Sequence, residues 1–167
     1  LEVALPENPL DQIAYRLEHP GVEAFRVTGA SDVDRWPLVV LDEFDGVGWS
    51  AAGGYRRLGT GISAGPAVSV RVRPHSATLT VPPGGGPWLP SQTWPAAVDD
   101  AAPYVAERYG TLLLPGAEGG VRYTLHWWQP QVDASALGDA PIDAEALGTP
   151  SETATAPESV EAIAEQA

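Results

Sequence analysis

Three carboxylates within four residues are the side chains best placed to do chemistry in this sequence. Asp42, Glu43 and Asp45 stand close together just before Gly46. Such a group can in principle bind Ca²⁺ or supply the acid and base of glycoside hydrolysis. The regularly spaced oxygen ligands of a calcium loop are missing, and sequence does not show how far apart two carboxyls stand across a sugar ring. The simpler interpretation is that Asp42 and Asp45 accept backbone N–H groups and build the turn into Gly46.

Other catalytic or metal-binding groups are sparse. The three histidines, His19, His75 and His126, are far apart and lack the spacing of metal ligands. There is no cysteine, which excludes disulfides, thiolate nucleophiles and thiolate zinc sites. We also expect no serine nucleophile of the elbow type, and the glycine-rich segment 82–87 lacks the lysine and the following helix of a phosphate loop. The sequence therefore predicts no catalytic residue, no metal and no cofactor.

Tryptophan is unusually frequent, with six residues in 167. Indole faces suit carbohydrate and aromatic ligands, so the tryptophans could form a binding platform, or they could fill the core of a sandwich and its loops. Trp127 and Trp128 are adjacent on an expected strand, so only one of them can face inward. A binding module would show at least two exposed, coplanar indoles with a carboxylate beside them. The six residues are Trp36, Trp49, Trp88, Trp94, Trp127 and Trp128.

Composition and charge limit the fold and the partners. Glycine (18) and proline (17) make up about a fifth of the chain, which favours turns over long helices. The net charge is −13, and residues 131–167 contain eight acids and no base. This charge opposes binding to the phosphate backbone of a nucleic acid. No apolar run approaches the roughly 18 residues of a membrane span. Because the chain begins at Leu1 without methionine, we interpret it as a segment of a longer protein.

The elements that must position these residues can be read from periodicity. The pattern predicts an amphipathic helix over 8–19, with an apolar stripe that covers a sheet. The apolar run 38–41 predicts a strand buried on both faces, around which the chain is organised and which leads into the acidic turn. A glycine-rich, mobile loop is expected over 51–65, with a possible edge strand at 55–58. The apolar stripe consists of Leu10, Ile13, Ala14 and Leu17.

Short alternating runs separated by turns predict further strands. The link 73–76 is either a hairpin turn or a bulge within one long strand, while 82–90 and 98–103 are expected to be irregular. On the last strand, Tyr123, Leu125 and Trp127 share one face with Val121. The fold class is all-β, an antiparallel β-sandwich-like domain with one or two short marginal helices. These further strands are expected at 24–28, 68–72, 77–81, 104–107, 111–114 and 121–128.

The segment Leu41–Trp49, LDEFDGVGW, resembles a signature close to L-D-x-F-D-G-x-x-W in one bacterial family. The family comprises the transglutaminase-like membrane proteins of the TgpA type, and the signature belongs to their external region. Three further matches follow the family's order, namely Asn8–Leu10, Trp88–Pro90 and Gly120–Leu125. The resemblance spans roughly residues 8–130. It departs from the family at Trp36–Pro37, where relatives more often continue a strand.

The resemblance implies a domain outline. Membrane helices would precede an extracytoplasmic β-rich accessory domain at 1–130. An acidic Pro/Ala/Thr linker would follow at 131–156, and 157–167 would begin a helix of the transglutaminase-like core. The catalytic Cys, His and Asp of such proteins would lie beyond this chain. The partners would be that core and the membrane helices of the same polypeptide, with a cell-wall glycan or peptide as a further candidate.

Three hypotheses of function follow from these observations. The first is a non-catalytic extracytoplasmic accessory domain of a membrane-anchored transglutaminase-like protein, which positions the catalytic core or its cell-wall substrate. The alternative is a carbohydrate- or peptide-binding module that uses exposed tryptophans. A third, an independent hydrolase, needs two of the clustered carboxylates to converge in a cleft. The candidate structural or ligand-contact residues are Asp42, Phe44, Asp45, Gly46, Trp49, Trp88 and Trp128.

Overall fold

The computed structural model describes residue 10 and residues 13–51, 53–59, 61–62 and 71–132. By its contacts the chain divides into two units, Leu1–Gln131 and Val132–Ala167, and every described helix and strand lies in the first. Among the described residues, no helix combines the length and hydropathy needed to span a membrane. The elements are α1 (Ile13–Glu18), β1 (Arg26–Thr28), β2 (Glu43–Phe44), β3 (Trp49–Ser50), β4 (Arg56–Arg57), β5 (Val72–Val81), β6 (Trp88–Leu89), β7 (Pro95–Asp99), β8 (Tyr104–Ala106), β9 (Thr111–Leu113), the 3₁₀ turn η2 (Ala117–Gly119) and β10 (Val121–Pro130).

The longest ladder joins β5 and β10, at the centre of a four-stranded antiparallel sheet with the order β1-β5-β10-β7. All ten residues of β5 pair with β10 in one unbroken register, from Val81 opposite Val121 to Val72 opposite Pro130. The link 73–76 is therefore neither a turn nor a bulge but part of one strand. Pro74 is tolerated there because β1 pairs only with 78–80, so that β5 forms an edge of the sheet at this proline.

A second antiparallel sheet has the order β4-β8-β9-β6. Strands β8 and β9 form a hairpin whose connection closes on Gly110, where the backbone has φ 71° and the N–H donates to the Ala106 carbonyl. The expected edge strand at 55–58 is confirmed as β4, and the expected strands at 104–107 and 111–114 are confirmed as β8 and β9. Strands β6 and β7 lie in or next to segments expected to be irregular.

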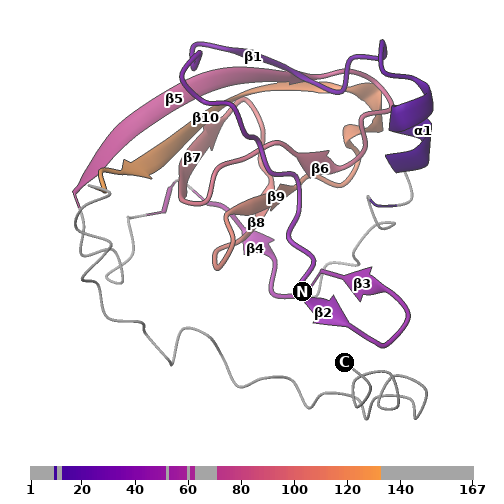
Figure 1. Ribbon diagram of the computed structural model, residues 1–167. Coiled ribbons are helices and arrows are strands. Elements are labelled where there is room, and N and C mark those ends of the chain that lie inside the picture. The colour runs from indigo at the N-terminus through magenta and orange to yellow at the C-terminus, as the bar shows by residue number, and fades with distance from the viewer. Residues whose placement is uncertain (1–9, 11–12, 52, 60, 63–70, 133–167) are drawn as a thin grey trace, which may run out of the picture. The chain divides into compact units, whose positions relative to one another are not determined.

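The two sheets enclose the main core. The first sheet contributes Leu79, Tyr123 and Leu125, and the second contributes Leu112 and other fully buried apolar residues. The predicted inward face of 121–128 is confirmed, and the all-β fold class with it. The Tyr123 hydroxyl donates to the Pro90 carbonyl at 2.5 Å, and burial raises its pKa. Figure 1 shows β5 and β10 running together across one side of β6, β8 and β9.

The expected central strand at 38–41 is wrong. Residues 33–42 belong to no strand, and Leu38 and Val39 are only partly buried, against the small cluster around Tyr55. The Ser91 N–H donates to the Pro37 carbonyl at 3.0 Å, which helps to hold this segment to the body. An apolar run indicates burial, but a strand also needs a free neighbouring edge, and the ladders of both sheets are made by other segments. The chain is organised around β5 and β10 instead.

A helix is present at Ile13–Glu18 within the expected span, but the two described members of its stripe, Leu10 and Leu17, are not buried against a sheet. Leu17 is 75% exposed and Leu10 is 44% exposed. Periodicity shows which side chains share a face of a helix, whereas burial requires a surface packed against that face. The loop expected over 51–65 contains the buried Tyr55 and Leu58. The expectations for 68–70 and for the linker and helix after 132 lie outside the described residues, as does most of 1–12.

Candidate functional site

The acidic turn joins β2 and β3 in a two-stranded hairpin. The Asp45 carboxylate accepts the N–H groups of Val47 at 2.8 Å and Gly48 at 2.7 Å, and the Asp45 N–H donates to the Gly48 carbonyl at 3.2 Å. Gly46 supplies the φ of 96° that the turn requires. The interpretation that Asp45 builds the turn is confirmed. The bonds from Gly48 and Val47 hold the pKa of Asp45 below its ordinary value.

Asp42 connects this hairpin to the second sheet. Its carboxylate accepts the Tyr109 hydroxyl at 2.5 Å, and its N–H donates to the Ser50 carbonyl at 3.1 Å. The bond to this carboxylate raises the pKa of Tyr109, because the neutral phenol is the donor. For Asp42 the structure thus shows an anchor across 67 residues of sequence.

Nothing in the arrangement of these carboxylates supports the hydrolase hypothesis. Asp45 holds the turn, Asp42 bonds Tyr109, and Glu43 lies exposed on β2. None of the three lines a pocket described for this molecule. The described residues contain no group of three acids or histidines that could hold a metal ion. These three carboxylates therefore do not form a pair that faces across a cleft.

The histidines lie in three separate places. His19 Nδ1 is 2.9 Å from the Tyr15 carbonyl at the end of α1, and His75 stacks on Trp127. His126 Nε2 is 2.8 Å from the Asp99 carboxylate on the neighbouring strand β7, near the surface. The prediction of no serine nucleophile of the elbow type overlooks a G-x-S-x-G motif at 61–65. A nucleophile elbow follows directly on a strand, whereas neither Gly61 nor Ile62 is in one, and Ser63 lies outside the described residues.

The hairpin presents an apolar tip, which we define as Phe44, Val47 and Trp49. Val47 is 94% exposed, Phe44 is 55% exposed and Trp49 is 50% exposed. The two rings are 5.0 Å apart, so they form one surface. Single exposed apolar residues are ordinary, but three together on a turn held by Asp45 are typical of a contact site. Figure 1 shows β2 and β3 extending away from the two sheets.

All six tryptophans are described, and most of them pack in the core or at its edge. Trp88 is buried against Tyr55, at a ring distance of 5.9 Å. Trp127 is 2% exposed, with Trp36 edge-on at 5.6 Å. Trp128 points to the other face and is half-buried, and its Nε1–H reaches the Ile62 carbonyl at 3.5 Å. Of the six, Trp49 alone is as much as half exposed, so two exposed coplanar indoles are not found.

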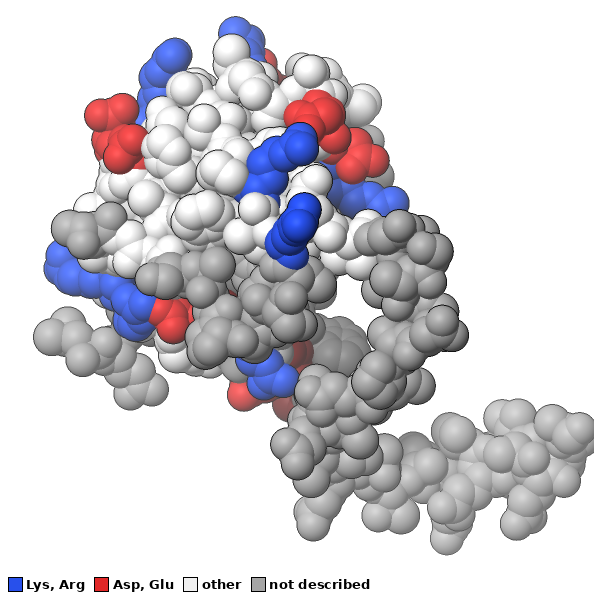
Figure 2. Space-filling view, turned by 90° about the vertical axis from the view of Figure 1, so that its left-hand side faces the viewer, with Lys and Arg blue, Asp and Glu red and all other residues white. Residues whose placement is uncertain are grey.

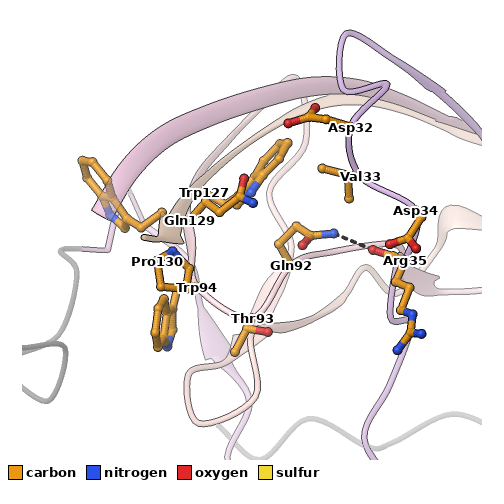
Figure 3. Close-up of a pocket in the computed structure, with 11 residues that line it drawn as sticks. Asp32, Val33, Asp34, Arg35, Gln92, Thr93, Trp94, Trp127, Gln129 and Pro130 are labelled. Atoms are coloured by element: carbon orange, nitrogen blue, oxygen red, sulfur yellow. Dashed lines mark hydrogen bonds between the residues drawn. The ribbon is translucent and has the colours of Figure 1, made fainter. Parts of the chain in front are cut away.

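A pocket of about 340 Å³ lies beside the end of β10. Figure 3 shows the segment Asp32–Arg35 on one side, Trp127 and Gln129 on the other, and Gln92 between them. The Gln92 amide donates to the Arg35 carbonyl at 2.8 Å, which joins two segments 57 residues apart. The Gln129 Oε1 atom is buried and has no hydrogen-bond partner in the described part of the chain. The full lining is Asp32, Val33, Asp34, Arg35, Gln92, Thr93, Trp94, Trp127, Trp128, Gln129 and Pro130.

Comparison with the models of known protein families assigns the chain to a family. The family model of the TgpA N-terminal domain matches residues 16–134, well over half of the sequence. The chain belongs to the TgpA N-terminal domain family. The resemblance carried by Leu41–Trp49 is thereby confirmed. No curated protein and no solved structure matches the chain.

The family match identifies this TgpA N-terminal domain as a region distinct from the catalytic core of TgpA-type proteins. The absence of cysteine from the chain agrees with a non-enzymatic segment. Both the apolar tip and the pocket lie within the matched residues.

Sequence reasoning on this TgpA N-terminal domain missed the pocket. Gln92, Gln129 and Arg35 lie in segments without a motif, and they meet only through the fold. Tyr109 was missed as the partner of Asp42 for the same reason. The one usable signal was the alternation on β10, which places Gln129 on the same face as Trp127.

Proposed function

We propose that this TgpA N-terminal domain is a non-catalytic extracytoplasmic accessory domain of a membrane-anchored transglutaminase-like protein. It positions the catalytic core of the same polypeptide, or presents a cell-wall substrate to that core. The observation that carries the proposal is the family match over 16–134 in a chain without a cysteine nucleophile. The domain therefore contributes binding and orientation, while the chemistry belongs to another part of the protein.

The apolar tip supports a positioning role. Asp45 holds the hairpin turn with two hydrogen bonds, and Asp42 ties the hairpin base to Tyr109 in the turn between β8 and β9. A surface that is exposed yet held in shape loses little conformational entropy when it docks. We assign the catalytic core as the occupant of this tip. The reason is that an accessory domain of one polypeptide meets its own core at a high effective concentration, so that a small apolar contact is enough.

The docking role is tested in the full-length protein that contains this domain. We expect the amides of Val47 and Gly48 to exchange with solvent at least about tenfold more slowly in the full-length protein than in the isolated 167-residue chain, because docking blocks local opening. The double variant Phe44→Ser with Trp49→Ser should abolish this difference. The control is Leu17→Ser, which changes an even more exposed apolar residue on α1. Equal exchange at the hairpin in both proteins contradicts the docking role.

The location is tested separately, through the absence of cysteine from the domain. Val22 is exposed, so Val22→Cys introduces one reactive thiol on its surface. We expect a membrane-impermeant maleimide to label this variant in intact cells as fully as in permeabilised cells. The parent protein with the unmodified domain gives the background from other cysteines. Labelling that requires permeabilisation places the domain on the inner side of the membrane and contradicts the proposal.

A further inference from the structure

The pocket beside the end of β10 has the size and composition of a ligand site. Its volume of about 340 Å³ lies within the range of small-molecule sites, roughly 300–1,000 Å³. Figure 2 views the side of the molecule where β5 begins and β10 ends, and in its upper part charged side chains of both signs stand around white, uncharged surface. The bond from Gln92 to the Arg35 carbonyl closes one end of the pocket, so its walls are held before any ligand arrives.

The polar groups of the lining are mixed in charge and mostly planar. Asp32 and Asp34 offer carboxylate acceptors, and Arg35 offers guanidinium donors from the same turn. With two carboxylates against one guanidinium, the lining disfavours an anion such as a phosphate or a carboxylate. A ligand that both donates and accepts hydrogen bonds without a net charge fits this set best.

The aromatic groups supply the apolar wall. Trp94 lines the pocket and is half-buried, so part of its side chain remains accessible. Trp127 is almost fully buried and forms the base of the wall. Indole faces pack well against the C–H faces of a sugar ring, and the surrounding planar polar groups can bond its hydroxyls.

Gln129 places an unsatisfied hydrogen-bond acceptor in the pocket. Its Oε1 is buried, and no described donor reaches it. A buried acceptor left without a donor is destabilising, so binding of a ligand that supplies the donor is favoured. A hydroxyl group in the pocket supplies that donor. A purely apolar ligand would leave Gln129 unsatisfied and would desolvate Asp32 as well.

We propose that this pocket binds a short neutral saccharide, with Gln129 accepting a hydrogen bond from a sugar hydroxyl and Trp94 contributing to the apolar wall. The inference goes beyond the accessory role, because it assigns a site and a ligand class. It is independent of where the domain lies and of what the apolar tip contacts, so either proposal can fail while the other stands.

The test uses the 167-residue chain and three neutral trisaccharides of different linkage, N-acetylchitotriose, cellotriose and maltotriose. Binding is followed by calorimetry and by the six indole N–H signals in ¹⁵N–¹H NMR spectra. We expect at least one probe to bind saturably at millimolar concentration or below, corresponding to about −4 kcal/mol or stronger. The indole signal of Trp94 should shift, and that of Trp49 should not.

The deciding variant is Gln129→Leu, with Gln131→Leu as its matched control. Gln131 undergoes the same chemical change two residues away and is exposed, outside the lining. We expect Gln129→Leu to weaken binding about tenfold while the Tm stays unchanged or rises, because an unsatisfied acceptor has been removed. Gln131→Leu should change affinity less than about twofold.

Three results overturn the inference. One is the absence of saturable binding for all three trisaccharides. Another is an equal effect of the two glutamine variants on affinity. The last is binding of the neutral peptide tri-alanine with the same indole shifts and higher affinity than any sugar, which would make the pocket a peptide site.

Discussion

Replacing Gly110 by alanine is expected to lower the free energy of unfolding by about 3–5 kcal/mol. Gly110 closes the β8–β9 hairpin with φ 71°, a conformation that costs energy for a residue with a side chain. A Cβ at this position would also overlap the backbone oxygens of Gln92 and Thr93 and lie 2.6 Å from the Thr93 carbonyl carbon. Because these are backbone atoms of a closely packed segment, relief requires moving the chain that lines the pocket.

The control for this prediction is Gly46→Ala in the β2–β3 turn. Gly46 also has positive φ, at 96°, but an added Cβ would meet no atom within 4 Å. Its expected cost is only that of the strained backbone, about 1–2 kcal/mol. Urea unfolding followed by tryptophan fluorescence measures both variants. Equal losses of unfolding free energy in the two variants would show that the positive φ alone, and not the close approach of the backbone at 92–93, determines the cost of Gly110→Ala.

Replacing Trp127 by alanine is expected to cost about 3–5 kcal/mol of stability, the range for truncating a large aromatic residue in a core. Trp127 is 2% exposed, lies edge-on to Trp36 and stacks on His75 at 5.5 Å. Its removal opens a cavity beside the β5–β10 ladder, which rigid strands cannot fully close.

Trp49 provides the contrast within the same residue type. It is half exposed on the β2–β3 hairpin, so Trp49→Ala should change the free energy of unfolding by less than about 1 kcal/mol. Both variants are compared by thermal and urea unfolding under the same conditions. If Trp49→Ala destabilised the chain as much as Trp127→Ala, the hairpin would be part of the folding core and could not serve as a separate contact surface.

The features that the sequence alone could predict are those decided by short-range physics. Alternation with a period of two places Tyr123, Leu125 and Trp127 on one face, and the structure buries all three. The Asp45 turn is equally local, since the carboxylate bonds amides two and three residues ahead. The motif Leu41–Trp49 indicated the family in the same way, because it is a contiguous stretch that can be recognised without knowing the fold.

Only the tertiary structure decided which apolar segments pair and which polar residues meet. The run 38–41 has the composition of a buried strand, yet it lies outside both sheets because β4, β6, β8 and β9 form the ladders beside it. The bond between Asp42 and Tyr109 spans 67 residues, and that between Gln92 and Arg35 spans 57. Such contacts depend on how the two sheets pack. A local sequence pattern therefore cannot predict which distant residue a side chain will bond. The same holds for the tryptophans. Their side chains are identical, and only the packing of the sheets determines which of them are buried and which are exposed.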